Sequence, residues 1–212
     1  MKIIAIINEK GGGGKSTVAT NLATYWHRQG KHVVLIDADP QGTARDWRAA
    51  SPDGADLPQV FAVDKHQMLG DLLKSIVAAD YVVIDAPAKA EGMSAAVVRV
   101  AHLALLVVQP SGADIWASAA AVKMIQARRA AGGEIDAAFL VNRTIGNTKL
   151  SKLMKDGSWN GYELDQLTAT IGNRVAFAQA LTDGLSVFDL QDAAAKSEII
   201  EISKELEAAK WL

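Results

Sequence analysis

The sequence predicts an α/β fold with a single doubly wound, mostly parallel sheet that carries helices on both faces. Two observations lead to this class. Short runs rich in Val, Ile and Leu recur along the chain and each ends in a polar residue, which is typical of strands buried on both faces. Segments with helical patterning lie between these runs, and regular alternation of strand and helix is typical of a parallel sheet wrapped on both sides.

The expected strands and helices alternate along the chain, and functional groups in such folds gather where the strands end. Strands are expected at Lys2–Asn8, His32–Asp37, Tyr81–Asp85, Leu103–Gln109 and Ala137–Asn142. Helices are expected at Lys15–Gln29, Met68–Ala79, Ala90–Ala101, Ala117–Ala131 and Ala193–Leu212. Ser51–Leu57 and Gly157–Gly161 are expected to be surface loops.

Length and composition favour one soluble globular domain over residues 1–212, with half of the residues hydrophobic and 22% charged. The absence of cysteine excludes a disulfide framework, a thiolate metal site and cysteine ligation of an iron–sulfur cluster by this chain. The longest apolar stretch, Ala95–Val108, contains Arg99 and His102 and falls short of the roughly 20 residues that a membrane span needs. No secretory segment precedes the first charges, so we expect a cytoplasmic protein without a membrane partner.

The segment Glu9–Thr17, EKGGGGKST, joins the first expected strand to the first expected helix, which is where a phosphate-binding loop occurs. Consecutive glycines let the backbone turn its N–H groups toward phosphates: Gly11, Gly12, Gly13 and Gly14. Lys15 can reach the terminal phosphates, and the Ser16 hydroxyl, next to Thr17, can bind Mg²⁺. The alternative, a glycine-rich turn with a solvated Lys15, is disfavoured by the strand, the spacing and the Lys-Ser-Thr ending.

The loop departs from the ordinary phosphate-loop pattern, because Glu9 stands where that pattern has its first glycine and Lys10 follows it. The run KGGGGKST resembles the signature of the ParA/MinD group of P-loop ATPases. This resemblance implies binding of ATP and Mg²⁺ and an ATP-dependent homodimer, in which Lys10 reaches the phosphates held by the partner subunit, as an arginine finger does. The alternative is that Lys10 is an ordinary solvated loop residue.

Two acids follow the second expected strand, at Asp37 and Asp39. A carboxylate beside the phosphates can orient water for attack on the γ-phosphate. The segment Val33–Gln41 resembles the first switch of the family, which implies this catalytic part for Asp39. The same resemblance implies that Asp37 supports the magnesium waters or the switch. For either residue taken alone, a cap or turn former is an equal alternative.

Asp85 ends the strand Tyr81–Asp85, in a pattern that places a carboxylate near Mg²⁺. The resemblance makes Asp85–Ala88 the second switch. Where many relatives have a glycine soon after the proline, this chain has Ala88-Lys89-Ala90, which leaves the contacts to the γ-phosphate there open. The candidate metal residues are therefore Ser16, Asp37 and Asp85.

Asn142 and Arg143 follow the last expected strand. An Asn side chain offers both a hydrogen-bond donor and an acceptor, which suits a purine. The resemblance implies that Asn142 contacts the adenine edge, with a turn residue as the alternative, and that Arg143 either stacks on the base or faces solvent. Trp116 is expected on the same side of the sheet, either at a dimer interface or in the core.

The ends of the chain bear on which branch of the family it resembles. Asp183–Phe188 and Ala194–Ile199 resemble the small plasmid-partition ATPases related to ParF, and a first strand at residue 2 leaves no room for an operator-binding helix-turn-helix. MinD-like relatives end in a basic amphipathic helix. Here Glu198–Leu212 contains four Glu and two Lys, the wrong sign for anionic lipid, and its apolar residues are expected to face the core.

ParA-like relatives bind DNA without sequence preference through basic side chains that contact phosphates. The candidates here are Lys149, Lys152 and Lys155, which recur every three residues, together with Arg174. The alternative for the lysines is a solvated helix face. The net charge of −2 means that any DNA contact must come from such a local patch.

The resemblance to ParA-like members implies an ATP-driven dimeric switch that binds nucleoid DNA and has weak, partner-stimulated ATPase activity. It would segregate a plasmid or chromosome through a ParB-like or other adaptor. The alternative cargo is a carboxysome or a chemoreceptor cluster, and a MinD-like membrane-positioning ATPase is less favoured. A reductase-type enzyme of similar fold would need cluster cysteines, and an inactive scaffold would not need Lys10, Lys15, Asp39 and Asp85 together.

Overall fold

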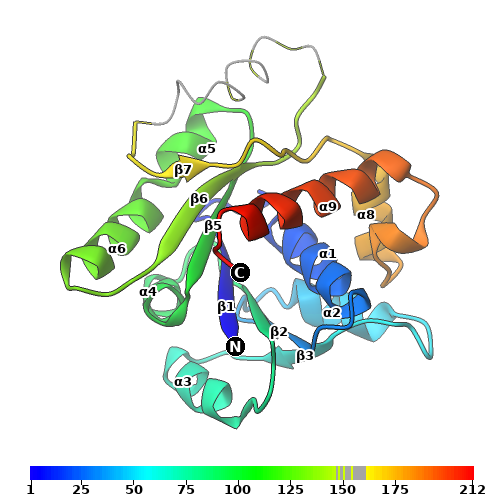
Figure 1. Cartoon of the computed structure of the whole chain (residues 1–212), viewed down its shortest axis with the longest axis horizontal. Helices are drawn as coiled ribbons and strands as arrows, with labels where there is room; N and C mark the ends of the chain where they lie inside the picture. Colours follow the sequence, from blue (N-terminus) through cyan, green and yellow to red (C-terminus); the bar gives the residue numbers. More distant parts are fainter. Residues whose placement is uncertain (147, 149, 151–153, 155–160) are drawn as a thin grey trace.

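A single seven-stranded sheet forms the centre of the molecule, with helices on both of its faces (Figure 1). The computed structural model describes residues 1–146, 148, 150, 154 and 161–212. The strands are β1 (Lys2–Ile7), β2 (Val33–Asp37), β3 (Gln59–Ala62), β4 (Tyr81–Asp85), β5 (Leu103–Val108), β6 (Asp136–Val141) and β7 (Asp165–Gln166). They are ordered β3-β2-β4-β1-β5-β6-β7 and every pair of neighbours is parallel, so the predicted fold class is confirmed.

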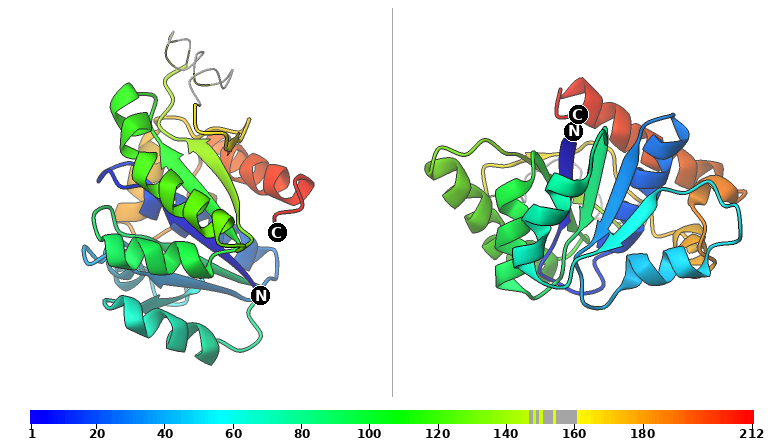
Figure 2. Two further views of the ribbon diagram at one scale, coloured as in Figure 1. Left: turned by 90° about the vertical axis from the view of Figure 1, so that its left-hand side faces the viewer. Right: turned by 90° about the horizontal axis from the view of Figure 1, so that it is seen from below.

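The helices form two layers that bury opposite faces of the sheet (Figure 2). One layer contains α1 (Lys15–Arg28), α2 (Thr43–Ala50), α8 (Val175–Thr182) and α9 (Ala193–Ala208), with the short 3₁₀ turn η1 (Val187–Asp189) before α9. The other contains α3 (His66–Ser75), α4 (Glu91–Val100) and α6 (Ala119–Ala130), with α5 (Gly112–Ala117) just before α6. Because side chains alternate across a strand, Ile3, Ala5 and Ile7 of β1 meet the second layer, while Ile4 and Ile6 meet the first.

Elements with strong local patterning lie close to their expected positions, and those without it were missed. The buried central strands begin and end within one residue of expectation. The edge strand β3 has mostly exposed side chains and β7 has only two residues, so neither carries a buried-strand pattern. The helix expected at Ala117–Ala131 is α6, which Ser118 separates from α5.

The expected helix Met68–Ala79 begins earlier and ends earlier, as α3. The residues after α3, which the expected helix included, turn back toward the sheet. Ala78 has a left-handed φ of 65°, and the Asp80 N–H donates to the His32 carbonyl at 2.8 Å. These contacts direct the chain into β4 and prevent the helix from continuing to Ala79.

The last helix, α9, packs on the core through its apolar residues and anchors a loop through its acidic ones. Ile199, Ile202 and Leu206 are fully buried, as predicted. Both carboxylate oxygens of Glu205 accept hydrogen bonds from the N–H groups of Thr168 and Ala169. Part of the negative charge of α9 therefore holds the segment that leads into α8. No helix in the described ranges is both long and apolar enough to cross a membrane.

The carboxyl ends of β1, β2 and β4 meet at one edge of the sheet, where α1 begins. The β2–β4 register places Asp37 beside Asp85, and the β1–β4 register places Ile6 beside Asp85. The loop that follows β1 therefore lies next to both acids. This edge is where ligands bind in open parallel sheets.

Candidate nucleotide site

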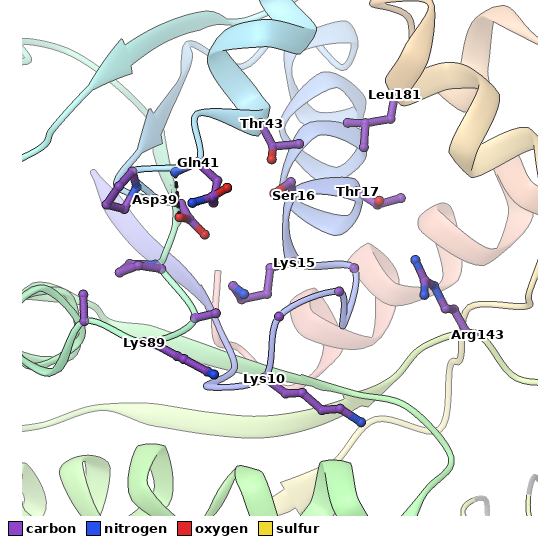
Figure 3. Close-up of a pocket in the computed structure, with 17 residues that line it drawn as sticks. Lys10, Lys15, Ser16, Thr17, Asp39, Gln41, Thr43, Lys89, Arg143 and Leu181 are labelled. Atoms are coloured by element: carbon purple, nitrogen blue, oxygen red, sulfur yellow. Dashed lines mark hydrogen bonds between the residues drawn. The ribbon is translucent and has the colours of Figure 1, made fainter.

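A cavity of about 760 Å³ opens at this edge of the sheet (Figure 3). Its walls come from the β1–α1 loop, the loop after β2 and the start of α2, and the segment after β4. Arg143, which follows β6, and Leu181 of α8 complete the lining. The lining residues from the β1–α1 loop and the start of α1 are Lys10, Gly11, Gly12, Gly14, Lys15, Ser16 and Thr17. Those from elsewhere include Asp39, Gln41, Thr43, Lys89, Arg143 and Leu181. Most of the residues predicted for the nucleotide site thus surround one cavity.

Glycine is required at the end of the loop by both backbone conformation and space. Gly14 has a φ of 94°, in the left-handed region, and forms the N-cap of α1. A Cβ atom at this position would lie 2.0 Å from the Asn142 Nδ2 atom. No other residue fits at position 14 unless Asn142 moves.

Three amide side chains, each directly after a buried strand, hold the backbone of the loop. Asn142 donates from Nδ2 to the Gly13 carbonyl at 2.8 Å, and Gln109 donates from Nε2 to the Gly12 carbonyl at 3.0 Å. Asn8 accepts from the Lys10 N–H at 3.0 Å through Oδ1, while its Nδ2 donates to the Val107 carbonyl at 2.6 Å. We had not predicted this role for Asn8 and Gln109. The polar residue that ends each strand was the available sequence signal.

Lys15 is the most enclosed cation of the loop, with 6% of its surface exposed. Burial lowers the pKa of its amino group, and the nearby carboxylates of Asp85 and Asp39 oppose this shift. Figure 3 shows the Lys15 side chain beside Asp39, with Ser16 and Thr17 following on α1. The amino group therefore faces the space where the loop can hold phosphates.

Asp85 is fully buried, and this burial raises the pKa of its carboxyl to about 7. Ser16 and Lys15 lower this pKa, whereas Asp37 and Asp39 raise it further. Ser16 lies close enough to lower the pKa of the carboxyl, but neither Asp85 oxygen accepts a hydrogen bond within the described part of the chain. A buried carboxylate without partners, next to a hydroxyl, has the donor chemistry that suits Mg²⁺ and its waters.

The Asp37 carboxylate is also fully buried, but its oxygens already have partners. Oδ1 accepts from the Asp39 N–H at 3.1 Å and Oδ2 accepts from the Arg45 N–H at 2.9 Å. Burial raises the pKa of Asp37, while these hydrogen bonds and the Arg45 charge lower it. Asp37 thus fixes the loop after β2. That loop places the half-buried Asp39 in the wall of the cavity.

Lys10 extends away from the cavity and binds an acid of α5. Its Nζ atom lies 2.7 Å from Asp114 Oδ2, and Asp114 is fully buried while 44% of the Lys10 side chain is exposed. Ser111, the N-cap of α5, donates to the same Asp114 oxygen at 2.5 Å. Asp114 was absent from our predicted site because it is 104 residues from Lys10 and follows no motif.

The two residues predicted to contact the base, Asn142 and Arg143, differ in exposure: Asn142 is buried and Arg143 is exposed. Asn142 is 3% exposed and its amide is occupied by Gly13 and by the Arg143 N–H, at 2.8 Å each. Arg143, with a left-handed φ of 56°, is exposed and lines the same cavity as Leu181, and Figure 3 shows both on the side of the cavity opposite Asp39. Leu181, which we had not predicted, adds an apolar wall at that end.

The predicted DNA contacts fall largely outside the described residues, since Lys149, Lys152 and Lys155 all lie there. Arg174 is described, and its guanidinium donates to Glu198 Oε1 from Nε at 2.9 Å and from Nη2 at 2.8 Å. Its charge is thus already paired with α9. Trp116 is 75% exposed, so the interpretation that it fills the core is wrong.

Comparison with known proteins assigns the chain to a family. The family model described as the CobQ/CobB/MinD/ParA nucleotide binding domain matches residues 4–187. The chain belongs to this family. Within it, the chain is 29% identical over 209 residues to the "Maintenance of carboxysome distribution protein A" of Halothiobacillus neapolitanus, covering 96% of this chain and 95% of that protein. The expected ParA/MinD resemblance is therefore confirmed.

The comparisons also found a further relative and a solved structure of the same fold. The chromosome-partitioning ATPase Soj of Thermus thermophilus is 61% identical over 41 residues, which cover 19% of this chain and 16% of that protein. The McdA–ATP complex of Cyanothece has the same fold, with a TM-score of 0.77 at 18% identity over 98% of this chain and 96% of that one. Nucleotide binding is the property that the family description names.

Proposed function

We propose that this chain is a magnesium-dependent ATPase that acts as an ATP-driven dimeric switch and positions a cargo. One observation carries the proposal: a single cavity is lined by the glycine loop, the buried Lys15 and the half-buried Ser16, and the fully buried carboxylate of Asp85 interacts with both Lys15 and Ser16. Two further cations, Lys89 and Arg143, line the same cavity, while the Lys10 amino group is bound to Asp114. A polyanion such as a nucleoside triphosphate is the ligand that matches this charge.

Each residue has a part in this chemistry that its contacts support. The N–H groups of the loop and the N-terminus of α1 bind the phosphates, and Lys15 neutralises charge that develops on them. Ser16 and, through water, Asp85 would hold Mg²⁺, which when bound neutralises phosphate charge. Asp39 orients the attacking water, and Asp37 supports the loop that carries Asp39.

The base lies at the end of the cavity formed by Arg143 and Leu181. A guanidinium plane and an apolar side chain can cover the faces of a purine. Asn142 holds the loop through Gly13, and the second N–H of its amide is the group that could contact the edge of the base.

Lys10 completes the site in a dimer. In the single chain its amino group is bound to Asp114 and points out of the cavity. Once released, it can reach the phosphates of a second copy and stabilise the transition state in trans. ATP thereby links dimer formation to hydrolysis, and the two nucleotide states can differ in affinity for other partners.

For the cargo, we propose a protein compartment such as a carboxysome, with plasmid or chromosome segregation as the second candidate. The relative that spans the whole chain is named for carboxysome distribution, whereas the named partition ATPase matches about a fifth of it. In both versions the ATP dimer binds nucleoid DNA through backbone phosphates, and an adaptor on the cargo stimulates hydrolysis. A shell-protein gene beside this one would support the compartment, and a centromere-binding protein gene would support segregation.

The test is to measure molecular mass, ATP hydrolysis and binding to arbitrary duplex DNA, with ATP, ADP or no nucleotide, at several salt concentrations. We expect the chain to be a dimer with ATP and not with ADP or without nucleotide. We also expect it to bind DNA with ATP, with an affinity that decreases steeply as the salt concentration rises. A chain that dimerises with ATP but does not bind DNA would contradict attachment to the nucleoid, while the proposed ATPase activity would stand. A chain that neither dimerises with ATP nor hydrolyses it would contradict the switch itself.

A further inference from the structure

Arg45, in the first turn of α2, connects three segments around the first switch, here the loop Ala38–Gly42. Its Nη2 atom donates to the Asp39 carbonyl oxygen at 3.0 Å. Its Nη1 atom donates to Asp64 Oδ1 at 3.0 Å, and its Nε atom lies 3.4 Å from Asp37 Oδ2. A single guanidinium therefore contacts the end of β2, the switch loop and the segment after β3.

These contacts close a ring around the main chain of Asp39. The Asp39 N–H donates to Asp37, and the Asp39 carbonyl accepts from both Arg45 Nη2 and the Gly42 N–H, the latter at 2.9 Å. The Asp37 carboxylate, in turn, accepts from the Arg45 N–H. The Asp39 side chain is held as well, because its Oδ1 accepts from the Gln41 N–H at 3.0 Å. Arg45 thus holds the main chain that carries the Asp39 carboxylate.

The surroundings of Arg45 are shaped for a guanidinium. Gly42 has a left-handed φ of 70°, and a Cβ atom there would lie 3.3 Å from Arg45 Nε and 3.5 Å from Nη2. The side chain of Arg45 is 32% exposed, yet its Nε atom is fully covered. The planar guanidinium donates to two acceptors from two separate nitrogens and places its third nitrogen beside Asp37, a spread that the compact ammonium of a lysine does not reproduce.

We propose that Arg45 is a positioning residue for Asp39, which sets the carboxylate that orients the attacking water without itself touching the nucleotide. The proposal rests on the proposed ATPase function for its effect on rate, but the effect on the loop is independent of it. Asp64 forms the outer arm of the arrangement and is 65% exposed, so it contributes less than the contacts to Asp37 and Asp39.

The experiment compares Arg45→Ala, Arg45→Lys and Asp64→Asn with the matched control Arg48→Ala. Arg48 lies three residues further along α2, and its guanidinium binds the Ser51 hydroxyl at 2.7 Å, away from the switch. Amide hydrogen exchange over residues 38–46 reports the loop, equilibrium binding reports ATP affinity, and steady-state kinetics report kcat.

We expect Arg45→Ala to speed exchange of the Asp39 and Gly42 amides by about tenfold or more, because their acceptors, the Asp37 carboxylate and the Asp39 carbonyl, both lose the guanidinium that holds them. Its kcat falls by about 10- to 100-fold while ATP affinity changes less than about twofold, since the change affects the geometry of attack and not the phosphate loop. The exchange rate and kcat of Arg45→Lys should lie between those of Arg45→Ala and wild type. Both quantities should stay within about threefold of wild type in Asp64→Asn. Arg48→Ala should change neither the exchange rate, nor kcat, nor ATP affinity.

Two results would overturn the proposal. One is unchanged exchange over residues 38–46 in Arg45→Ala, which would mean that the loop does not depend on the guanidinium. The other is an equal decrease in ATP affinity and in melting temperature in Arg45→Ala and Arg48→Ala, which would mean that Arg45 only stabilises α2. If wild type hydrolyses no ATP, the proposed function fails, and the exchange measurement still decides whether Arg45 sets Asp39.

Discussion

Lys10 and Lys15 lie at the two ends of the same glycine run but in opposite surroundings. Lys15 is almost fully buried, near Asp85 and Asp39, and faces the cavity. Lys10 is nearly half exposed and its amino group is bound 2.7 Å from a buried acid on another helix. The Lys15 end is thus complete within one chain, whereas the Lys10 end is held away from the phosphates. Under the proposed function, this difference corresponds to one lysine that serves its own nucleotide and another that serves a partner's.

The largest effect is expected from Lys10→Ala, which tests the outward-facing end. Hydrolysis should fall about 1,000-fold, since a charge supplied in trans to the transition state is lost. ATP affinity of the single chain should stay within about threefold of wild type, because Lys10 does not hold the phosphates in its own chain. Single-turnover hydrolysis and equilibrium ATP binding provide the two measurements. A large loss of ATP affinity would place Lys10 in its own site.

Lys15→Ala tests the enclosed end, and here affinity is the quantity that changes. We expect ATP binding to weaken by about 100-fold, equal to about 2.7 kcal/mol, because charge-assisted contacts to phosphate disappear. Titration with a fluorescent ATP analogue measures the change. The exposed Lys31, just after α1, is the matched control, and Lys31→Ala should bind as wild type does. Equal affinity in the Lys15 variant would contradict the enclosed role.

Asp85 allows a test by pH in the nucleotide-free protein. Burial raises the folded-state pKa of its carboxyl from 3.8 to about 7, so the folded chain binds this proton more tightly than the unfolded chain does. Its contribution to stability is therefore present below about pH 4 and is lost as pH rises toward 7, with a slope of at most about 1.4 kcal/mol per pH unit.

Denaturant unfolding without magnesium, from pH 5 to pH 8, measures this contribution. Asp85→Asn should remove the corresponding part of the pH dependence, because its side chain does not titrate. An identical pH profile in the variant would mean that Asp85 is not the group responsible. Its ionised form is what binding of Mg²⁺ requires, so the metal should favour the deprotonated state.

The smallest effect is expected from Lys89, the cavity cation directly after the second switch, where the resemblance left the contacts to the γ-phosphate open. Among the described residues Lys89 makes no ion pair, and Figure 3 shows its side chain extending toward the loop that carries Lys10 and Lys15. We expect Lys89→Ala to weaken ATP about fivefold while leaving ADP affinity unchanged, as for an exposed charge near the terminal phosphate. Competition between the two nucleotides measures the ratio. Equal losses for ATP and ADP would contradict contact with the γ-phosphate.

The parts of the site that sequence predicted are those specified by neighbouring residues. Glu9–Thr17 carries strand, glycines, lysine and hydroxyl in one run, and Asp85 ends an unmistakable buried strand. Asn8, Gln109 and Arg45 were missed because their partners come from other strands or loops. Asn142 was predicted for its chemistry, but its contact with Gly13 depends on the approach of β6 to the loop.

The same distinction holds for the fold. The central strands have uninterrupted apolar runs and were located, whereas β3 has exposed side chains and short helices such as α2 have only eight residues. Local patterning predicts an element when the element buries most of its residues. Edges and long-range contacts depend on parts of the chain that are distant in sequence.

The account's central claim is that Lys10 acts across a dimer, and mixing two inactive variants tests it most directly. Lys10→Ala keeps Asp39, and Asp39→Ala keeps Lys10. In a mixed dimer the Lys10→Ala subunit holds ATP beside its own Asp39 and receives the partner's lysine, so one of two sites is complete. We predict that an equimolar mixture recovers about a quarter of wild-type hydrolysis, as random pairing gives. A mixture no more active than the two variants measured separately would contradict action in trans.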